Sequence, residues 1–88
     1  MPYIKSEDRQ KPDELLAPFI EFVQSLPEGE QDGMLNYSFT RVLKDVYPQK
    51  YFHYNRAIGM LEACKLELYR HIVGPYEDEK ILENGDVK

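Results

Sequence analysis

Three segments of this chain carry apolar residues at helical spacing, and proline or glycine stands between them. Residues that recur every three or four positions form a single stripe on a helix, so the pattern predicts helices over about 12–26, 34–47 and 55–73. The 88 residues have room for one core only, which predicts a single domain over 1–88, mainly α, folded as a small three-helix bundle. The stripes are Leu15, Leu16, Phe19, Ile20, Val23 and Leu26; Leu35, Phe39, Val42, Leu43 and Val46; and Ile58, Leu61, Leu68, Tyr69 and Ile72.

Prolines and glycines set the expected ends of these helices. Pro12 suits the first turn of a helix. Pro18 conflicts with a regular helix, so the first helix either kinks there or begins late enough to hold Pro18 in its first turn. We expect residues 27–33 to form a loop and Gly74-Pro75 to end the third helix.

The segment 76–88 is expected to be an acidic tail, since it holds five acidic residues and two lysines. Its Asn84-Gly85 pair is typical of a tight turn between two strands. We therefore expect a short β-hairpin from strands at 81–83 and 86–88, or β pairing of the two termini through Tyr3-Ile4. The acids also suit a hard cation, but their spacing matches no calcium loop.

Charge and cysteine content exclude several classes of protein. The net charge of −5 argues against a general nucleic-acid binder, and one cysteine excludes an internal disulfide or a four-cysteine zinc site. Motifs for phosphate loops, dinucleotides, zinc hydrolases and calcium loops are absent, so we expect no enzyme, no cofactor and no metal. Acids arrive early in the sequence and no apolar run approaches membrane-helix length, which predicts a cytoplasmic protein without a membrane partner.

Several short motifs resemble a family of short uncharacterised proteins from prokaryotes and their phages. They are Met1-Pro-Tyr-Ile-Lys, Glu7-Asp8-Arg9, Leu35-Asn36-Tyr37, Thr40-Arg41, Ile58-Gly59, Leu61-Glu62, Lys65-Leu66-Glu67, Tyr69-Arg70, Pro75-Tyr76-Glu77 and Asn84-Gly85-Asp86-Val87. The resemblance spans nearly the whole chain, and Pro18 and Gln31-Asp32-Gly33 depart from the pattern. It implies no activity and no catalytic residues, because the family has no assigned activity.

Two charged residues of the third helix fall in the middle of its apolar face. Glu62 and Lys65 are three residues apart, close enough to pair on a helix. One interpretation is a buried polar network completed by Tyr69, Arg41 or the tail. The alternatives are a functional site with perturbed proton affinities, a pair that meets a second subunit, or a misplaced helix boundary.

Basic and aromatic residues alternate in the segment 41–56. This pattern is typical of single-stranded nucleic-acid binding, where cations hold phosphates and rings stack on bases. The structural alternative is that the rings seal the end of the bundle while the charges stay in water. The candidate binding patch is Lys44, Lys50, Tyr51, His53, Tyr54 and Arg56.

The sequence favours a small non-enzymatic protein that associates with itself or docks to another protein. The apolar face predicted for the first helix is wide and includes Phe22 beyond its inner stripe. Such a face gains stability when an oligomer covers it, and tyrosines such as the seven in this chain are frequent at interfaces. The second hypothesis is a single-stranded nucleic-acid-binding accessory protein that uses the segment 41–56.

Overall fold

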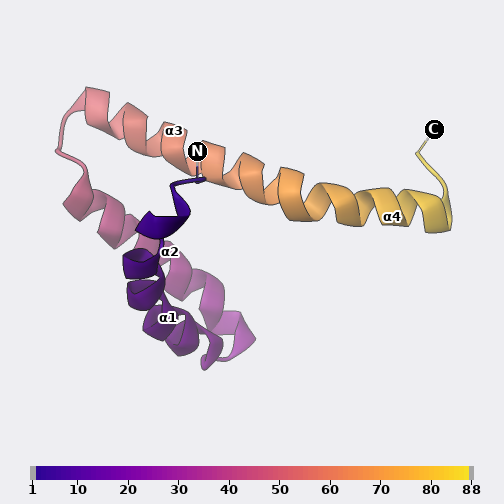
Figure 1. The fold of residues 1–88 in the computed structure, drawn as a ribbon, viewed down its shortest axis with the longest axis horizontal. Coiled ribbons are helices and arrows are strands. Elements are labelled where there is room, and N and C mark those ends of the chain that lie inside the picture. The colour runs from indigo at the N-terminus through magenta and orange to yellow at the C-terminus, as the bar shows by residue number, and fades with distance from the viewer. Residues whose placement is uncertain (1, 88) are drawn as a thin grey trace.

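A computed structural model describes residues 2–87, and these residues form an all-helical chain (Figure 1). A short 3-10 turn, η1, precedes four α-helices, and a π-helical segment, η2, joins the last two. The elements are η1 (Ser6–Asp8), α1 (Gln10–Gln24), α2 (Glu28–Val46), α3 (Tyr51–Leu68), η2 (Tyr69–Val73) and α4 (Gly74–Asn84). The prediction of a mainly α fold is confirmed.

Helix α1 begins at Gln10 and continues through Pro18 to Gln24. Pro18 therefore lies inside the helix, where it removes one backbone donor. The helix ends where the Ser25 N–H donates to the Glu21 carbonyl at 3.0 Å. The apolar face predicted for the first helix thus belongs to a helix that starts and ends two residues earlier than expected.

The loop expected at 27–33 is wrong, because α2 begins at Glu28 directly after Pro27. The Glu30 N–H donates to the Pro27 carbonyl at 2.9 Å, which starts the first turn. Glu28 and Glu30 lie in the first turn of α2, where their negative charges interact favourably with the positive end of the helix dipole. Glycine inside a helix costs about 1 kcal/mol relative to alanine, which is much less than the cost of proline. The segment can therefore be helical despite Gly29 and Gly33.

Helices α3, η2 and α4 follow one another without interruption, so the prediction that Gly74-Pro75 ends the third helix is also wrong. Pro75 has no N–H, and its ring crowds the carbonyl one turn earlier, which usually breaks or kinks an α-helix. Here the preceding turn is wider, because the Gly74 N–H donates to the carbonyl of Tyr69, five residues back. The wider turn lets the helix pass the proline and continue to Asn84.

The expected acidic tail is mostly helix, and the expected β-hairpin is not borne out. No residue from Pro2 to Val87 lies in a strand, and Tyr3-Ile4 does not pair with the other end of the chain. Gly85 has a φ of 86° and donates its N–H to the Ile81 carbonyl at 2.8 Å. The Asn84-Gly85 pair therefore ends a helix, where a left-handed glycine is common, instead of turning a hairpin. The strand expected at 86–88 lies partly outside the described residues.

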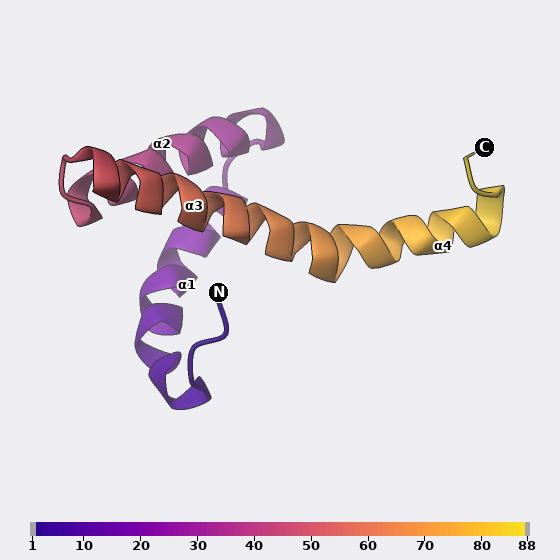
Figure 2. The same cartoon turned by 90° about the horizontal axis from the view of Figure 1, so that it is seen from above.

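The helices do not close into the expected three-helix bundle. Among residues 2–87, only Val23 of α1 and Ala57 of α3 are buried. Figures 1 and 2 show the reason: α1 and α2 form a V-shaped hairpin at one end of the molecule, while α4 extends away from it. The apolar faces of the three predicted helices are present, but they do not enclose a common core.

The accessible surface and the radius of gyration of the molecule are both larger than those of a compact domain. Its accessible surface is 8055 Å², whereas a compact monomer of this mass exposes about 5,400 Å². Its radius of gyration is 16.8 Å, against about 12 Å for a compact domain of this length. No helix within the described residues is long and apolar enough to cross a membrane.

Two glycines allow a test of the helix boundaries. Gly33 lies inside α2 with open space where a Cβ would stand, whereas Gly85 has a positive φ that a Cβ disfavours. We expect Gly33→Ala to raise the free energy of unfolding by about 0.5–1 kcal/mol, since alanine is the better helix former. We expect Gly85→Ala to speed hydrogen exchange of the last turn of α4. Thermal unfolding and hydrogen exchange measure these effects, and a lower melting temperature for Gly33→Ala would contradict the start of α2 at Glu28.

Candidate interaction surface

An open groove lies between α2 and α3 where the two helices diverge from their connecting turn. Its volume is about 570 Å³. Apolar side chains from both helices form much of its wall, and one lysine, two tyrosines, a threonine and a glutamine complete the lining. We call it the α2–α3 groove and define it by Leu43, Lys44, Tyr54, Ala57, Ile58 and Leu61. Ile58 is 66% exposed and Leu61 is 37% exposed, so the groove presents apolar surface to solvent.

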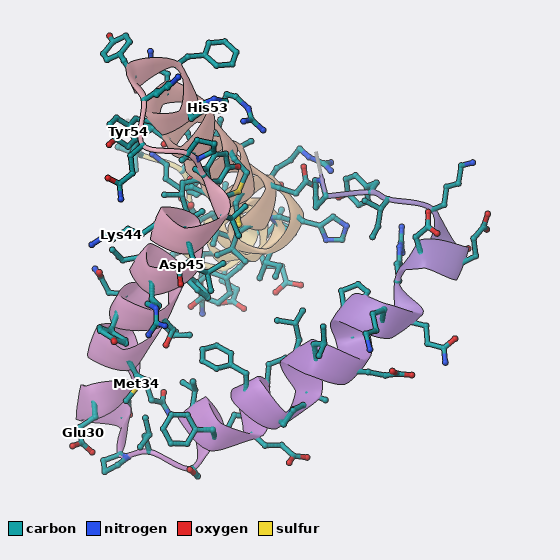
Figure 3. All side chains as sticks on the ribbon, turned by 90° about the vertical axis from the view of Figure 1, so that its left-hand side faces the viewer. Glu30, Met34, Lys44, Asp45, His53 and Tyr54 are labelled. Carbon is teal, nitrogen blue, oxygen red and sulfur yellow. The ribbon has the colours of Figure 1, made fainter. Side chains whose placement is uncertain are left out.

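The predicted binding patch gathers around the turn that joins α2 to α3. Figure 3 shows the end of α2, with Lys44 and Asp45, close to the start of α3, with His53 and Tyr54. The α3 helix begins at Tyr51, four residues earlier than expected, so the aromatic residues at 51–54 are helical. We call Lys44, Lys50, Tyr51, His53, Tyr54 and Arg56 the α2–α3 corner.

Arg56 holds part of this corner together. Its guanidinium is 2.8 Å from His53 Nδ1 and stacks over the Tyr47 ring, 5.1 Å from the centroid. Arg56 is held by His53 and Tyr47, whereas the ion pairs, hydrogen bonds and ring contacts of the described residues include neither the Lys44 nor the Lys50 ammonium group. The rings do not seal a bundle end either, since Tyr51 is 79% exposed. The corner therefore presents two lysines and an exposed ring to solvent.

The buried network expected around Glu62 and Lys65 is not formed. The two residues do pair, with Lys65 Nζ 3.0 Å from Glu62 Oε1, but their side chains are 69% and 55% exposed. Arg41 pairs with Asp45 of its own helix at 3.1 Å, and Tyr69 donates its hydroxyl proton to Glu77. The apolar face that should have covered the pair is itself open to solvent, which is why the pair is exposed.

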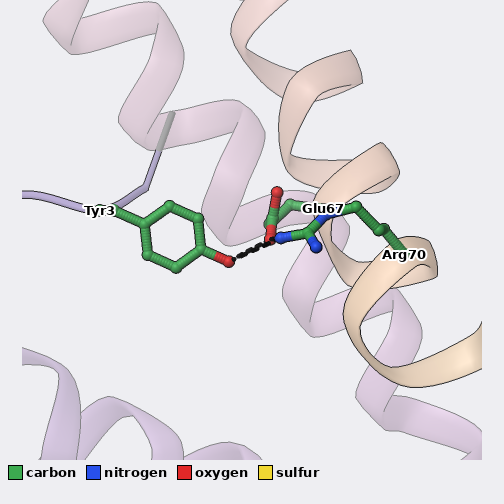
Figure 4. A network of polar contacts seen from close by, with 3 residues as sticks. All are labelled: Tyr3, Glu67 and Arg70. Carbon is green, nitrogen blue, oxygen red and sulfur yellow. Dashed lines mark hydrogen bonds and ion pairs between the residues drawn. The ribbon is translucent and has the colours of Figure 1, made fainter. Parts of the chain in front are cut away.

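A cluster of polar side chains that the sequence analysis missed joins the start of the chain to α3 (Figure 4). The Tyr3 hydroxyl donates to a Glu67 carboxylate oxygen, and Arg70 donates to the same oxygen at 2.5 Å. Arg70 also lies 3.2 Å from the Tyr3 hydroxyl oxygen. Nearby, Arg9 donates twice to the Ile4 carbonyl, which fixes the path of the N-terminal segment. The sequence analysis missed this cluster because Tyr3 and Glu67 are 64 residues apart, and no local pattern relates them.

Hydrogen bonds in this cluster shift the pKa values of the Glu67 carboxyl and the Tyr3 hydroxyl. The bond from Tyr3, followed by that from Arg70, lowers the pKa of the Glu67 carboxyl from its ordinary value of 4.5. Donation to Glu67 raises the pKa of the Tyr3 hydroxyl above 10.0. Each shift favours the protonation state that keeps the bond. The cluster is therefore a pH-dependent clasp of the N-terminal segment.

Helix α4 carries the second polar cluster and several unpaired acids. The bond from Tyr69 to Glu77 spans the π segment and raises the pKa of the Tyr69 hydroxyl. Lys80 pairs with Glu83 at 3.1 Å and stacks over the Tyr76 ring. No other described side chain forms an ion pair with Asp78 or Glu79. We call the segment Tyr69–Asn84, which comprises η2 and α4, the arm.

Between Pro2 and Val87 no three His, Cys, Asp or Glu side chains are grouped closely enough to hold a metal ion. Cys64 is an exposed free thiol on α3. The geometry that the chain does build is an apolar groove beside two lysines at one end and an acidic arm at the other.

These features define an all-helical protein with an open apolar groove. The chain belongs to a family described as a domain of unknown function (DUF6899), whose model matches residues 1–87. This membership agrees with the resemblance to an uncharacterised family. No curated protein and no solved structure matches the chain.

The clasp formed by Tyr3, Glu67 and Arg70 predicts a pH window. Lowering the folded-state pKa of Glu67 adds stability that is present above 4.5 and lost as the pH falls through the lowered value. Raising the folded-state pKa of Tyr3 adds stability that is present below 10.0 and lost as the pH rises through the raised value. We therefore expect the Tyr3 ring to stay docked across neutral pH and to detach at both extremes.

Nuclear Overhauser contacts between the Tyr3 ring and α3 report this docking. In Tyr3→Phe the contribution of the Tyr3 hydroxyl disappears and that of Glu67 becomes smaller, because phenylalanine has no hydroxyl to donate while Arg70 still bonds to Glu67. In Glu67→Gln we expect the acid transition to vanish, whereas Glu14→Gln on α1 should leave it unchanged. An acid transition of Tyr3 docking that is the same in Glu67→Gln as in the unmodified protein would refute the clasp.

Proposed function

We infer that this protein is a non-enzymatic interaction protein whose helices complete their core with another polypeptide. The observation that carries this proposal is the surface area. The chain exposes 8055 Å², which is about 2,700 Å² more than a compact monomer of its mass. Burial of apolar surface is the main force that stabilises a fold, so a chain this open gains most by covering that surface.

Exposed apolar side chains occur on every α-helix. Exposure spread over the whole chain favours an interaction surface over a packing defect at one place. Phe22, the residue beyond the inner stripe of α1, is 49% exposed. Tyr37 and Val42 on α2 are 64% and 54% exposed, and Ile72 in the arm is 59% exposed. Soluble monomers seldom expose apolar patches of more than a few hundred Å², and larger patches mark interaction sites.

Substitution of Ile58 by glutamate tests the proposal. Ile58 is 66% exposed in the single chain, so a monomer should tolerate Ile58→Glu with little change. In an interface the same change buries a charge, and we expect the assembly to dissociate at a protein concentration at least roughly tenfold higher than before. Sedimentation velocity measures the dissociation. Val87→Glu is the matched control, because Val87 is 92% exposed and lies outside the helices.

Small-angle scattering supplies the contrary outcome. A chain that sediments at 10.4 kDa with a radius of gyration near 12 Å would have closed its core alone and would overturn the proposal. A monomer that keeps a radius near 16.8 Å would overturn self-association and leave a different protein as the partner.

Single-stranded nucleic-acid binding is the second candidate function. The specific observation in its favour is the exposure of Tyr51 (79%) and Phe52 (69%) beside Lys50 at the start of α3. Exposed rings next to a lysine without an ion-pair partner suit base stacking and phosphate contact. The net charge of −5 keeps this function second to protein interaction.

Fluorescence anisotropy with a labelled single-stranded oligonucleotide tests the second function. We expect binding at low salt that weakens as salt is added, because phosphate contacts release counterions. Lys50→Glu should reduce the affinity by roughly tenfold or more at low salt, whereas Lys11→Glu on α1 should not. Absence of binding at low salt, or equal binding by both variants, would remove nucleic acid as a ligand.

The proposed setting is the cytoplasm of a prokaryotic cell. The single Cys64 has no partner for an internal disulfide, and reduced thiols are usual in that compartment. The resemblance to short proteins of prokaryotes and their phages points the same way.

A further inference from the structure

We propose that the partner is a second copy of this chain, paired antiparallel so that the arm of each copy lies in the α2–α3 groove of the other. This inference rests on the proposed interaction function and names its partner. Four features support it: the continuous helix formed by α3, η2 and α4, the charges at its two ends, the apolar α2–α3 groove, and the large exposed surface.

The long helix places the arm and the groove at opposite ends of the molecule. Segments of 18, 5 and 11 residues follow one another from Tyr51 to Asn84. Figures 1 and 2 show α4 pointing away from the turn between α2 and α3. In this conformation the arm does not reach the groove of its own chain. Antiparallel pairing of two such helices about a two-fold axis brings each arm to the groove of the other copy.

Charge along the helix favours that antiparallel order. The segment 41–56 holds four lysine and arginine residues and one aspartate, whereas 76–87 holds five acidic residues and one lysine. Lys44 and Lys50 lack ion-pair partners at one end, and so do Asp78 and Glu79 at the other, all within the described residues. Parallel pairing would set like charges side by side, which is unfavourable. Antiparallel pairing gives the unpaired lysines acidic partners in both halves of a symmetric interface.

The arm also carries an apolar residue that suits the groove. Leu82 is 86% exposed and lies three or four residues after Asp78 and Glu79, so the three share one side of α4. With Leu82 against the apolar walls, the two carboxylates lie at the rim, where Lys44 stands. The packed unit of α2, α3 and the other copy's α4 is a three-helix arrangement, completed between chains.

The exposed area is sufficient for a stable dimer. If each copy buried half of its excess surface of about 2,700 Å², the interface would total about 2,700 Å². Obligate homodimers bury roughly 2,000–5,000 Å² in total and are more apolar than transient complexes. The open conformation of a single chain therefore provides enough surface for one symmetric interface.

Charge reversal in two places tests the pairing. One variant carries Lys44→Glu with Lys50→Glu, and the other carries Asp78→Lys with Glu79→Lys. Each variant alone should dissociate at a protein concentration roughly tenfold or more above that of the unmodified protein, since like charges face each other in both halves of the interface. The chain with all four changes should recover the original dissociation constant. Lys11→Glu is the control for a charge reversal away from the groove, and circular dichroism confirms that each variant is helical.

Mixing the two double variants gives the sharper result. Each arm then faces a groove of opposite charge, so we expect a heterodimer in native mass spectra, with one variant labelled with ¹⁵N. An arm that folds back on its own chain predicts recovery in the fourfold variant without heterodimers, which would overturn the exchange between copies. A stable oligomer that no charge reversal weakens would overturn the antiparallel arrangement while leaving self-association intact. Unmodified protein that stays monomeric up to millimolar concentration would overturn both.

Discussion

One backbone hydrogen bond decides the shape of this molecule. Because the Gly74 N–H reaches the Tyr69 carbonyl five residues back, the helix widens and passes Pro75 without a break. If the helix ended there, α4 would be free to turn back toward α1 and α2 and help to close a core. With the helix continued, the arm is held away from the hairpin and the apolar faces stay uncovered. Under the proposed pairing, this local geometry leaves the apolar faces for a second copy to cover.

The distribution of polar contacts is consistent with that open shape. The ion pairs join residues three or four apart in the chain, and apart from Glu67 their side chains are largely exposed. Pairs of this kind contribute little stability. The clasp of Tyr3 on Glu67 is different, since it links residues far apart in sequence, but it fixes only the N-terminal segment. No polar contact of the described residues substitutes for the missing apolar core.

Helical periodicity predicted the mainly α class and the approximate places of all three apolar stripes. It failed at the breakers, because glycine and proline act through neighbouring backbone geometry: Gly33 is tolerated within α2 and Pro75 is accommodated by a π turn. The hairpin signal of Asn84-Gly85 failed because the same positive φ also ends helices. Of the candidate residues, the corner around Lys50 was proposed from its local pattern, and binding there stays a prediction. The Glu62–Lys65 pair was found but wrongly buried, since burial depends on how helices are placed relative to one another.

Only Val23 and Ala57 are buried among the described residues, and this links folding to the concentration of the protein in the cell. When a chain completes its core with another chain, its folding is a second-order process, and its folded fraction depends on how many copies are present. Under the proposed pairing, a cell that makes few copies holds mostly open chains that proteases can cleave, and a cell that makes many holds mostly folded protein. Gene dosage and synthesis rate would then act as switches for this protein, with no ligand required.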